Sequence, residues 1–286
     1  MLTVSEMLKY GGIDTNTRIK LARHKDDREG VNLEELVHSG MFELYQSYQE
    51  RDVFKECDYV VSFIEGGRNQ ALLVGVYKVV NKIGVKGVPE EYRKHFGPEA
   101  KRDSAYKYTL IKMGGFEPFE KRLVFDWFIG SRSWFRILNK ETDIKILQWQ
   151  PEGYVAEFTG YDNVILSHIE LEKMINNPLG NKVWHDQLSS VKGVYLILDR
   201  KTGSLYVGVA KGISGFLGRW KDYANNGHGG NIQLMNIVLE DEKRKYDFQY
   251  SILKVVSSTA SPLEVLAEEK KYKKKLGTLD FGLNSN

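Results

Sequence analysis

The stretch that most restricts the possible folds is residues 191–210, which read VKGVYLILDRKTGSLYVGVA. Two runs of β-branched and aromatic residues flank the turn-forming tetrapeptide RKTG, and this pattern predicts an antiparallel β-hairpin. With a turn of two or four residues, Tyr195 faces Gly208 and Ile197 faces Tyr206. Both tyrosines then project from one face of the hairpin, and the glycine leaves space opposite Tyr195.

A helix is predicted between Pro262 and Gly277, preceded by an N-capping Ser261. On a helical wheel its apolar residues lie within about 60° of Glu269, which places this carboxylate at the centre of the buried stripe. A buried carboxylate is costly unless it is protonated, bound to a metal or paired with a cation such as lysine. Glu269 is therefore a candidate functional residue. Lysines cover the outer faces of this helix, among them Lys270, Lys271 and Lys274.

Between these two elements, residues 212–231 predict a short amphipathic helix that ends in a glycine-rich loop. Ile213 belongs to the expected apolar face. Arg219 and Tyr223, spaced at i and i+4, share the edge of that face, where they can bind a phosphate. The glycines of the loop would hold His228 on a pliable backbone.

Composition excludes several classes of protein. The chain has 286 residues, of which 42% are apolar and 28% charged, with a net charge of +3, as in an ordinary soluble protein of about two domains. No apolar run approaches the roughly 18 residues of a membrane span, and the N-terminus carries no secretory signal pattern. We expect a cytoplasmic protein that does not bind membranes.

Cysteine and histidine usage argues against zinc and iron–sulfur sites. The single Cys57 excludes an intrachain disulfide and multi-cysteine metal sites, and it is expected to be a buried structural thiol. The six histidines show no HExxH or HxH spacing, and the chain contains neither a P-loop nor a GxGxxG motif. Any metal would therefore be held mainly by carboxylate.

The N-terminal part predicts an α+β arrangement. Residues 1–50 have mostly helical spacing, whereas residues 58–158 contain six strand-like runs, enough for a small barrel or a strongly curved sheet. Residues 169–188 again predict polar helix, interrupted by NNPLGN.

The charge is divided unevenly along the chain. Residues 191–286 contain 15 Lys and Arg against 10 Asp and Glu, a net charge of +5, and the preceding residues contain 26 against 28, a net charge of −2. We place the domain boundary near Ser189, which predicts an N-terminal recognition or regulatory domain at 1–188 and a basic domain at 189–286.

Five elements of the basic domain resemble the GIY-YIG nuclease superfamily in order and spacing. They are GVY at 193–195, YVG at 206–208, the helical Arg219, Glu269 in the last helix and Asn284 near the C-terminal end. The resemblance covers nearly all of residues 191–286. Two features depart from the family pattern, namely valine for isoleucine in both name motifs and about three extra residues before the helix.

This resemblance implies a small α/β nuclease domain, with a hairpin and a third strand packed by helices, that hydrolyses DNA with one divalent metal, Mg²⁺ or Mn²⁺. It implies that Glu269 holds the metal, that Arg219 binds the scissile phosphate, and that Tyr195, with Tyr206, takes a proton from the attacking water. The last role requires a tyrosine pKa well below its reference of about 10. The remaining implied roles are proton or phosphate contacts for Tyr223 and His228, support from Lys211 and Asn284, and DNA contacts for Lys270, Lys271 and Lys274.

A nuclease domain of this size rarely selects its target alone, so the N-terminal region is the expected recognition element. Its aromatic-rich strands, with Trp127, Trp134, Phe135 and Trp149, faintly resemble the PUA-like barrels that include EVE and SRA readers of modified bases. Such a domain would stack an extruded base between aromatic rings. The alternative is that these side chains simply fill the core.

The leading hypothesis is a metal-dependent endonuclease of restriction or phage-defence type that cuts double-stranded DNA, modified or unmodified. A repair or homing nuclease, and a nucleic-acid-binding protein with a decayed nuclease domain, are the alternatives. Because a single metal site cuts one strand, duplex cleavage predicts a homodimer or successive nicks.

Overall fold

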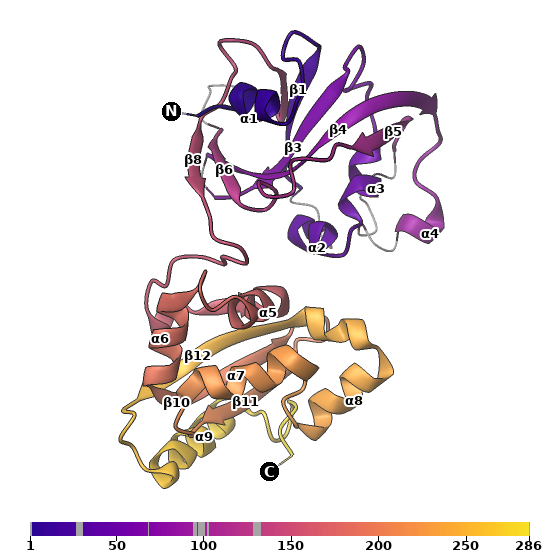
Figure 1. Ribbon diagram of the computed structural model, residues 1–286. Coiled ribbons are helices and arrows are strands. Elements are labelled where there is room, and N and C mark those ends of the chain that lie inside the picture. Colours follow the sequence, from indigo (N-terminus) through magenta and orange to yellow (C-terminus); the bar gives the residue numbers. More distant parts are fainter. Residues whose placement is uncertain are drawn as a thin grey trace. The chain divides into compact units, whose positions relative to one another are not determined.

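The computed structural model describes residues 2–26, 31–67, 69–93, 96, 101, 103–127 and 133–285. The chain forms two compact units, Met1–Gln150 and Pro151–Asn286 (Figure 1). Within the described residues, no helix is both long and apolar enough to cross a membrane.

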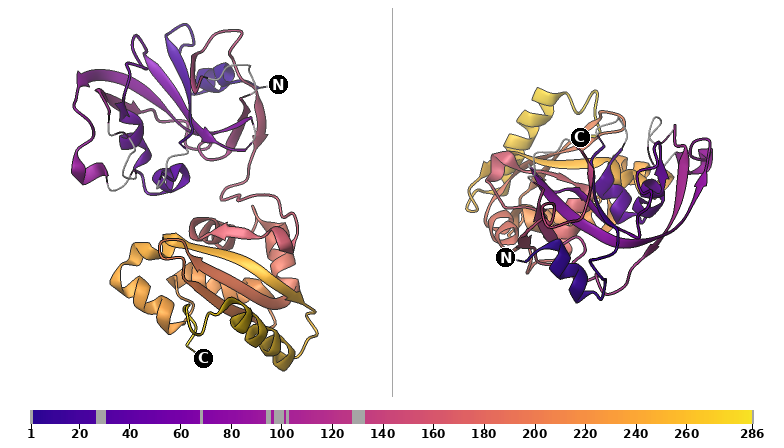
Figure 2. Two further views of the ribbon diagram at one scale, coloured as in Figure 1. Left: turned by 180° about the vertical axis from the view of Figure 1, so that it is seen from behind. Right: turned by 90° about the horizontal axis from the view of Figure 1, so that it is seen from above.

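The N-terminal unit is built on an eight-stranded, mostly antiparallel sheet that curls into a half-barrel (Figure 1, Figure 2). Its main path has the order β2-β5-β4-β3-β1-β7, and β6 joins β4 to β8; the β1–β3 pair is parallel. The strands are β1 (Ile19–His24), β2 (Tyr48–Gln49), β3 (Tyr59–Glu65), β4 (Gln70–Gly84), β5 (Tyr106–Lys112), β6 (Leu123–Asp126), β7 (Phe135–Ile137) and β8 (Ile146–Trp149). The helices are α1 (Val4–Tyr10), α2 (Leu33–His38), α3 (Phe42–Ser47) and α4 (Glu90–Arg93).

All six strand-like runs between residues 58 and 158 form strands, which confirms the predicted curved sheet. The expectation of mostly helix over residues 1–50 is wrong in part, because β1 and β2 lie there. The strand β1 is held by two strands distant in sequence, β3 on one side and β7 on the other. Its local residue pattern therefore gave little indication that it forms a strand. The Cys57 thiol is buried as expected, and this burial raises its pKa to about 11.

The C-terminal unit contains a four-stranded antiparallel sheet of order β11-β10-β12-β9. Helices α7 and α9 both pack against β10 and β11, and α5 and α6 pack on α7. The strands are β9 (Ile165–Ser167), β10 (Lys192–Asp199), β11 (Leu205–Ala210) and β12 (Phe248–Val256). The helices are α5 (His168–Asn176), α6 (Lys182–Ser190), α7 (Gly215–Asn226), α8 (Ile232–Glu240) and α9 (Pro262–Leu276), with short 3-10 turns η1 (Tyr161–Asn163) and η2 (Glu242–Asp247).

The compact units divide about forty residues earlier than the boundary placed near Ser189. Residues 151–190 pack with the C-terminal sheet, because β9 pairs with β12 and five apolar side chains of α5 and α6 join the core around β10. Those side chains are Leu171, Met174, Ile175, Trp184 and Leu188. The polar composition of these helices concealed this packing, since only one stripe of each is apolar.

The hairpin has the predicted register, in which Tyr195 pairs with Gly208 and Ile197 with Tyr206. The last helix begins with the predicted capping box at Ser261 and ends at Gly277. The helix α7 starts two residues later than expected, and Ile213 is fully exposed on the preceding loop rather than part of the apolar face.

The space opposite Tyr195 is filled by the tyrosine ring itself. A Cβ at position 208 would lie 2.4 Å from both Cζ and Oη of Tyr195. We therefore expect Gly208→Ala to lower the free energy of unfolding of the C-terminal unit by about 2 kcal/mol, measured by urea denaturation. Gly212→Ala is the matched control, since its Cβ would meet open space. Equal stability of the two variants would contradict this packing.

Candidate active site

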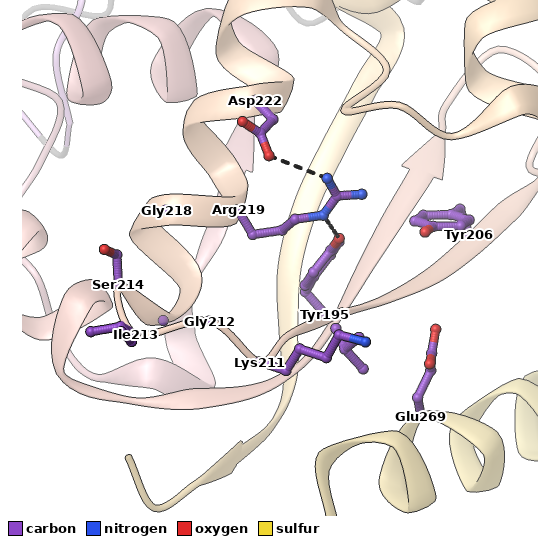
Figure 3. Close-up of a pocket in the computed structure, with 12 residues that line it drawn as sticks. Tyr195, Tyr206, Lys211, Gly212, Ile213, Ser214, Gly218, Arg219, Asp222 and Glu269 are labelled. Atoms are coloured by element: carbon purple, nitrogen blue, oxygen red, sulfur yellow. Dashed lines mark hydrogen bonds and ion pairs between the residues drawn. The ribbon is translucent and has the colours of Figure 1, made fainter. Parts of the chain in front are cut away.

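A cavity of about 500 Å³ opens beside the hairpin (Figure 3). The strands β10 and β11, the loop that follows β11, and the helices α7 and α9 all contribute to its wall. Segments far apart in the sequence thus meet at one place. The polar side chains that line the cavity are Tyr195, Tyr206, Lys211, Ser214, Arg219, Asp222 and Glu269.

The guanidinium of Arg219 is fixed by two buried tyrosines. Its Nε donates to the hydroxyl of Tyr195 and its Nη2 to the hydroxyl of Tyr223, both at 3.1 Å. The two hydroxyls are themselves hydrogen-bonded at 3.0 Å. Tyr195 and Tyr223 are both fully buried, so this three-membered network holds Arg219 in one orientation at the edge of the cavity.

The other end of the same guanidinium is held by α7 and the loop that follows it. Nη1 of Arg219 donates to the carbonyl of Gly229 at 2.6 Å and lies 3.3 Å from the carboxylate of Asp222. Among the described residues, these contacts and the two tyrosine bonds use four of the five N–H donors. One Nη2 donor is left for an anion, which fits a phosphate-binding arginine.

Burial raises the pKa of Tyr195 above its ordinary value; the nearby Tyr206 adds to this effect, and the charge of Arg219 opposes it. Burial likewise raises the pKa of Tyr223 well above its ordinary value. The lowered pKa expected for a general base at Tyr195 is therefore not present in the protein alone. Its geometry instead suits a neutral hydroxyl that orients Arg219.

Glu269 lies on α9 at the cavity wall, with 14% of its side chain exposed. The fully buried stripe predicted around it is not found, because Leu276 is 38% exposed and Pro262 is exposed. Lys273, one turn later and equally sheltered, pairs with the carboxylate at 3.1 Å. This ion pair offsets the cost of partial burial without a metal.

The same carboxylate fits a divalent cation of the Mg²⁺ type. Such an ion commonly takes one or two protein carboxylates and completes its shell with water and phosphate oxygens. No group of three or more His, Cys, Asp and Glu side chains that could hold a metal occurs in the described part of the chain. Glu269 would therefore be the principal protein ligand, in a cavity roomy enough for the remaining water molecules.

The histidine of the glycine-rich loop is not among the residues that line this cavity. The Nδ1 atom of His228 accepts a hydrogen bond from the backbone of Gly230 at 3.0 Å, within its own turn. The loop reaches Arg219 through the carbonyl of Gly229 instead. Lys211 does line the cavity, and Figure 3 shows its side chain directed toward the side on which Glu269 lies.

Asn284 is buried and anchors the C-terminal segment beside β11. Its Oδ1 accepts from the backbone N–H of Val207 and its Nδ2 donates to the Val207 carbonyl, each at 2.9 Å. Since Val207 lies next to Tyr206, this pairing supports the wall of the cavity rather than its contents.

The lysines expected to bind DNA line a second hollow, which has a volume of about 670 Å³ and lies on the outer face of α9. Lys271 is paired with Glu268 at 3.3 Å. None of these lysines lines the cavity that contains Glu269. They are Lys270, Lys271 and Lys274.

Two contacts of Arg219 escaped the sequence reasoning, and the lysine partner of Glu269, one of the alternatives left open, was not identified. The i, i+3 spacing of Arg219 and Asp222, and the i, i+4 spacing of Glu269 and Lys273, were readable signals of ion pairs. The carbonyl of Gly229 had no such signal, because backbone acceptors are carried by every residue.

Comparison with known proteins shows what this part of the chain is similar to. Residues 191–284 match the family model described as the GIY-YIG catalytic domain. The chain is also similar to two solved structures of the catalytic domain of the intron-encoded homing endonuclease I-TevI, one of them a point mutant. Identity is 24% and the TM-score 0.27 for both; the mutant match covers 34% of this chain and 94% of that one, and the other covers 32% and 96%. No curated protein matched the sequence.

Proposed function

We propose, on the premise that residues 191–284 match the family model of the GIY-YIG catalytic domain, that this protein is a metal-dependent DNA endonuclease of restriction or phage-defence type. One observation carries the assignment. Arg219, held by Tyr195 and Tyr223, faces the same cavity as the carboxylate of Glu269. A cation preorganised for phosphate can stabilise the negative charge that develops in phosphodiester hydrolysis, and the carboxylate beside it can hold a metal ion. The joint presence of these groups supports an active domain rather than a decayed one.

Within this cavity the scissile phosphate would bind the remaining Nη2 donor of Arg219. The tyrosine hydroxyls already hold the guanidinium in place, so little reorganisation is needed as negative charge develops on the phosphate. Tyr206, which lines the cavity with Glu269, is placed to donate a hydrogen bond to substrate or water. A divalent metal held by Glu269 would supply further positive charge to the developing oxyanion and acidify bound water.

The N-terminal unit would select the substrate, double-stranded DNA that is modified or unmodified, in the cytoplasm. Since one such site cuts one strand, duplex cleavage would need a homodimer or two successive nicks. The net charge of −2 before residue 191 favours local recognition over a broad DNA-wrapping surface.

The test is cleavage of supercoiled plasmid by the full-length protein. We expect nicked or linear product with Mg²⁺ or Mn²⁺ and none with EDTA. Parallel reactions on unmodified, methylated, hydroxymethylated and glucosylated DNA identify the recognition signal. A protein that binds DNA yet cuts none of these substrates with either metal would contradict the assignment.

A further inference from the structure

The N-terminal unit has a cavity of its own, of about 420 Å³, bordered by the end of β1, by α3 and β2, and by the start of β7. Its deep part is formed by buried side chains, and its rim by the exposed Lys25, Glu50 and Arg51. This volume lies in the range of small-molecule sites. The buried members are His24, Tyr45, Gln49, Val53 and Lys101.

Aromatic rings form much of the cavity wall. Trp134 and Phe135 are half-buried there, with their ring centroids 5.2 Å apart. Trp134 also lies 5.2 Å from the ring of His24. The other two aromatics expected to stack a base are elsewhere, since Trp127 is buried in the core and Trp149 is 55% exposed on β8. Half of the predicted aromatic set therefore reaches a cavity.

His24 is buried in the cavity wall with one polar atom unsatisfied. Its Nε2 has no hydrogen-bond partner within the described part of the chain. Burial and the positive charge of Lys101 lower the pKa of His24 to about 3, so the imidazole is neutral at physiological pH. A neutral ring can donate or accept at this position, and buried polar atoms normally have a partner.

Lys101 adds a buried cation to the same cavity. Its ammonium lies 4.3 Å from the ring centroid of Tyr45, and only 7% of the residue is exposed. Its backbone is left-handed, with φ of 61°, a conformation that costs energy for a residue other than glycine. Backbone strain of this kind concentrates at functional positions.

We propose that this cavity binds a single nucleobase, presented either by a free nucleotide or by DNA from which the base has been extruded. Trp134 and Phe135 meet edge to face at 75° and pack in part against the core, and their half-buried rings leave surface for stacking, which tolerates any base. The Nε2 of His24 and the Oε1 of Gln49, whose Nε2 already donates to the Gln46 carbonyl, are polar atoms for the base edge, and Arg51 on the rim offers a charge for the phosphate. The choice of DNA as one source rests on the nuclease function proposed above; the base-binding chemistry does not.

The test uses the full-length chain carrying Glu269→Gln, so that DNA stays intact. Titration calorimetry with the four deoxynucleoside monophosphates and with 5-methyl- and 5-hydroxymethyl-dCMP measures free nucleotides. Anisotropy of duplexes that contain the same base opposite an abasic site measures extruded bases, which are cheap to flip there. We expect at least one probe to bind, and Trp134→Ala to raise its Kd by about tenfold or more.

Trp149→Ala is the matched control, an exposed tryptophan of the same unit outside the cavity, and should leave Kd within about twofold. Arg51→Gln changes an exposed residue of the rim, and it should weaken the binding of a monophosphate more than that of the matching deoxynucleoside, titrated in the same way. If no probe binds, the proposal is wrong. It is also wrong if Trp134→Ala unfolds cooperatively on heating, and is therefore folded, yet binds every probe as tightly as the parent. Plasmid cleavage by the chain that retains Glu269 reports separately on the nuclease function.

Discussion

Glu269→Gln is expected to slow plasmid cleavage by about a thousandfold or more. Glutamine keeps the size of the side chain but removes the negative charge, and an amide is a weak ligand for a hard divalent ion. The measurement is the initial rate of nicking at several Mg²⁺ and Mn²⁺ concentrations. A rate that recovers partly at high metal concentration would show that the lost charge served to bind the metal.

Glu268→Gln is the control for this experiment. Glu268 precedes Glu269 on α9, is paired with Lys271 and does not line the cavity, so its loss should leave cleavage nearly unchanged. Both variants break one lysine ion pair of the same helix, and comparing their thermal unfolding separates stability from chemistry. Cleavage by Glu269→Gln at the wild-type rate would exclude Glu269 as a metal ligand.

Arg219→Lys should slow cleavage by about 10²- to 10³-fold while DNA binding changes little. Lysine keeps the positive charge but cannot reproduce the planar set of donors that contacts Tyr195, Tyr223 and the Gly229 carbonyl at once. Because two buried hydroxyls lose a donor, the free energy of unfolding should also fall, by about 1–3 kcal/mol. Single-turnover cleavage and urea denaturation measure the two effects.

Arg244→Lys is the control that separates the loss of cleavage rate from the loss of stability. Arg244 lies in the same unit and pairs with the buried Asp199 and with Asp247, away from the cavity. Its substitution should lower stability by a similar amount and leave the cleavage rate of the folded protein intact. If both variants lose cleavage equally, or if Arg219→Lys loses none, Arg219 does not act on the phosphate.

Much of the fold could be predicted because its signals are local. Alternating β-branched residues mark the six strands after residue 58, and a capping box and a glycine mark the ends of α9. The strands β1 and β2 were missed because their partners are distant in sequence. The packing of residues 151–190 onto the C-terminal sheet was missed for the same reason.

The candidate site was also predicted in part from local sequence patterns and in part by other means. The hairpin register, which brings Tyr195 and Tyr206 to one face, followed from the turn alone. The grouping of those tyrosines with Arg219 and Glu269 in one cavity followed from the family resemblance and is present in the structure. Their catalytic roles stay predictions for the cleavage experiments.

The sequence by itself determined which residues are available and where the hairpin and α9 begin and end, because periodicity and capping act over a few residues. Only the tertiary structure decided what surrounds each group. It gave Glu269 a lysine partner, bonded His228 to the backbone of its own turn and raised the pKa of Tyr195 by burying it. Burial and electrostatic surroundings are sums over segments that meet only in the folded chain, so no local pattern contains them.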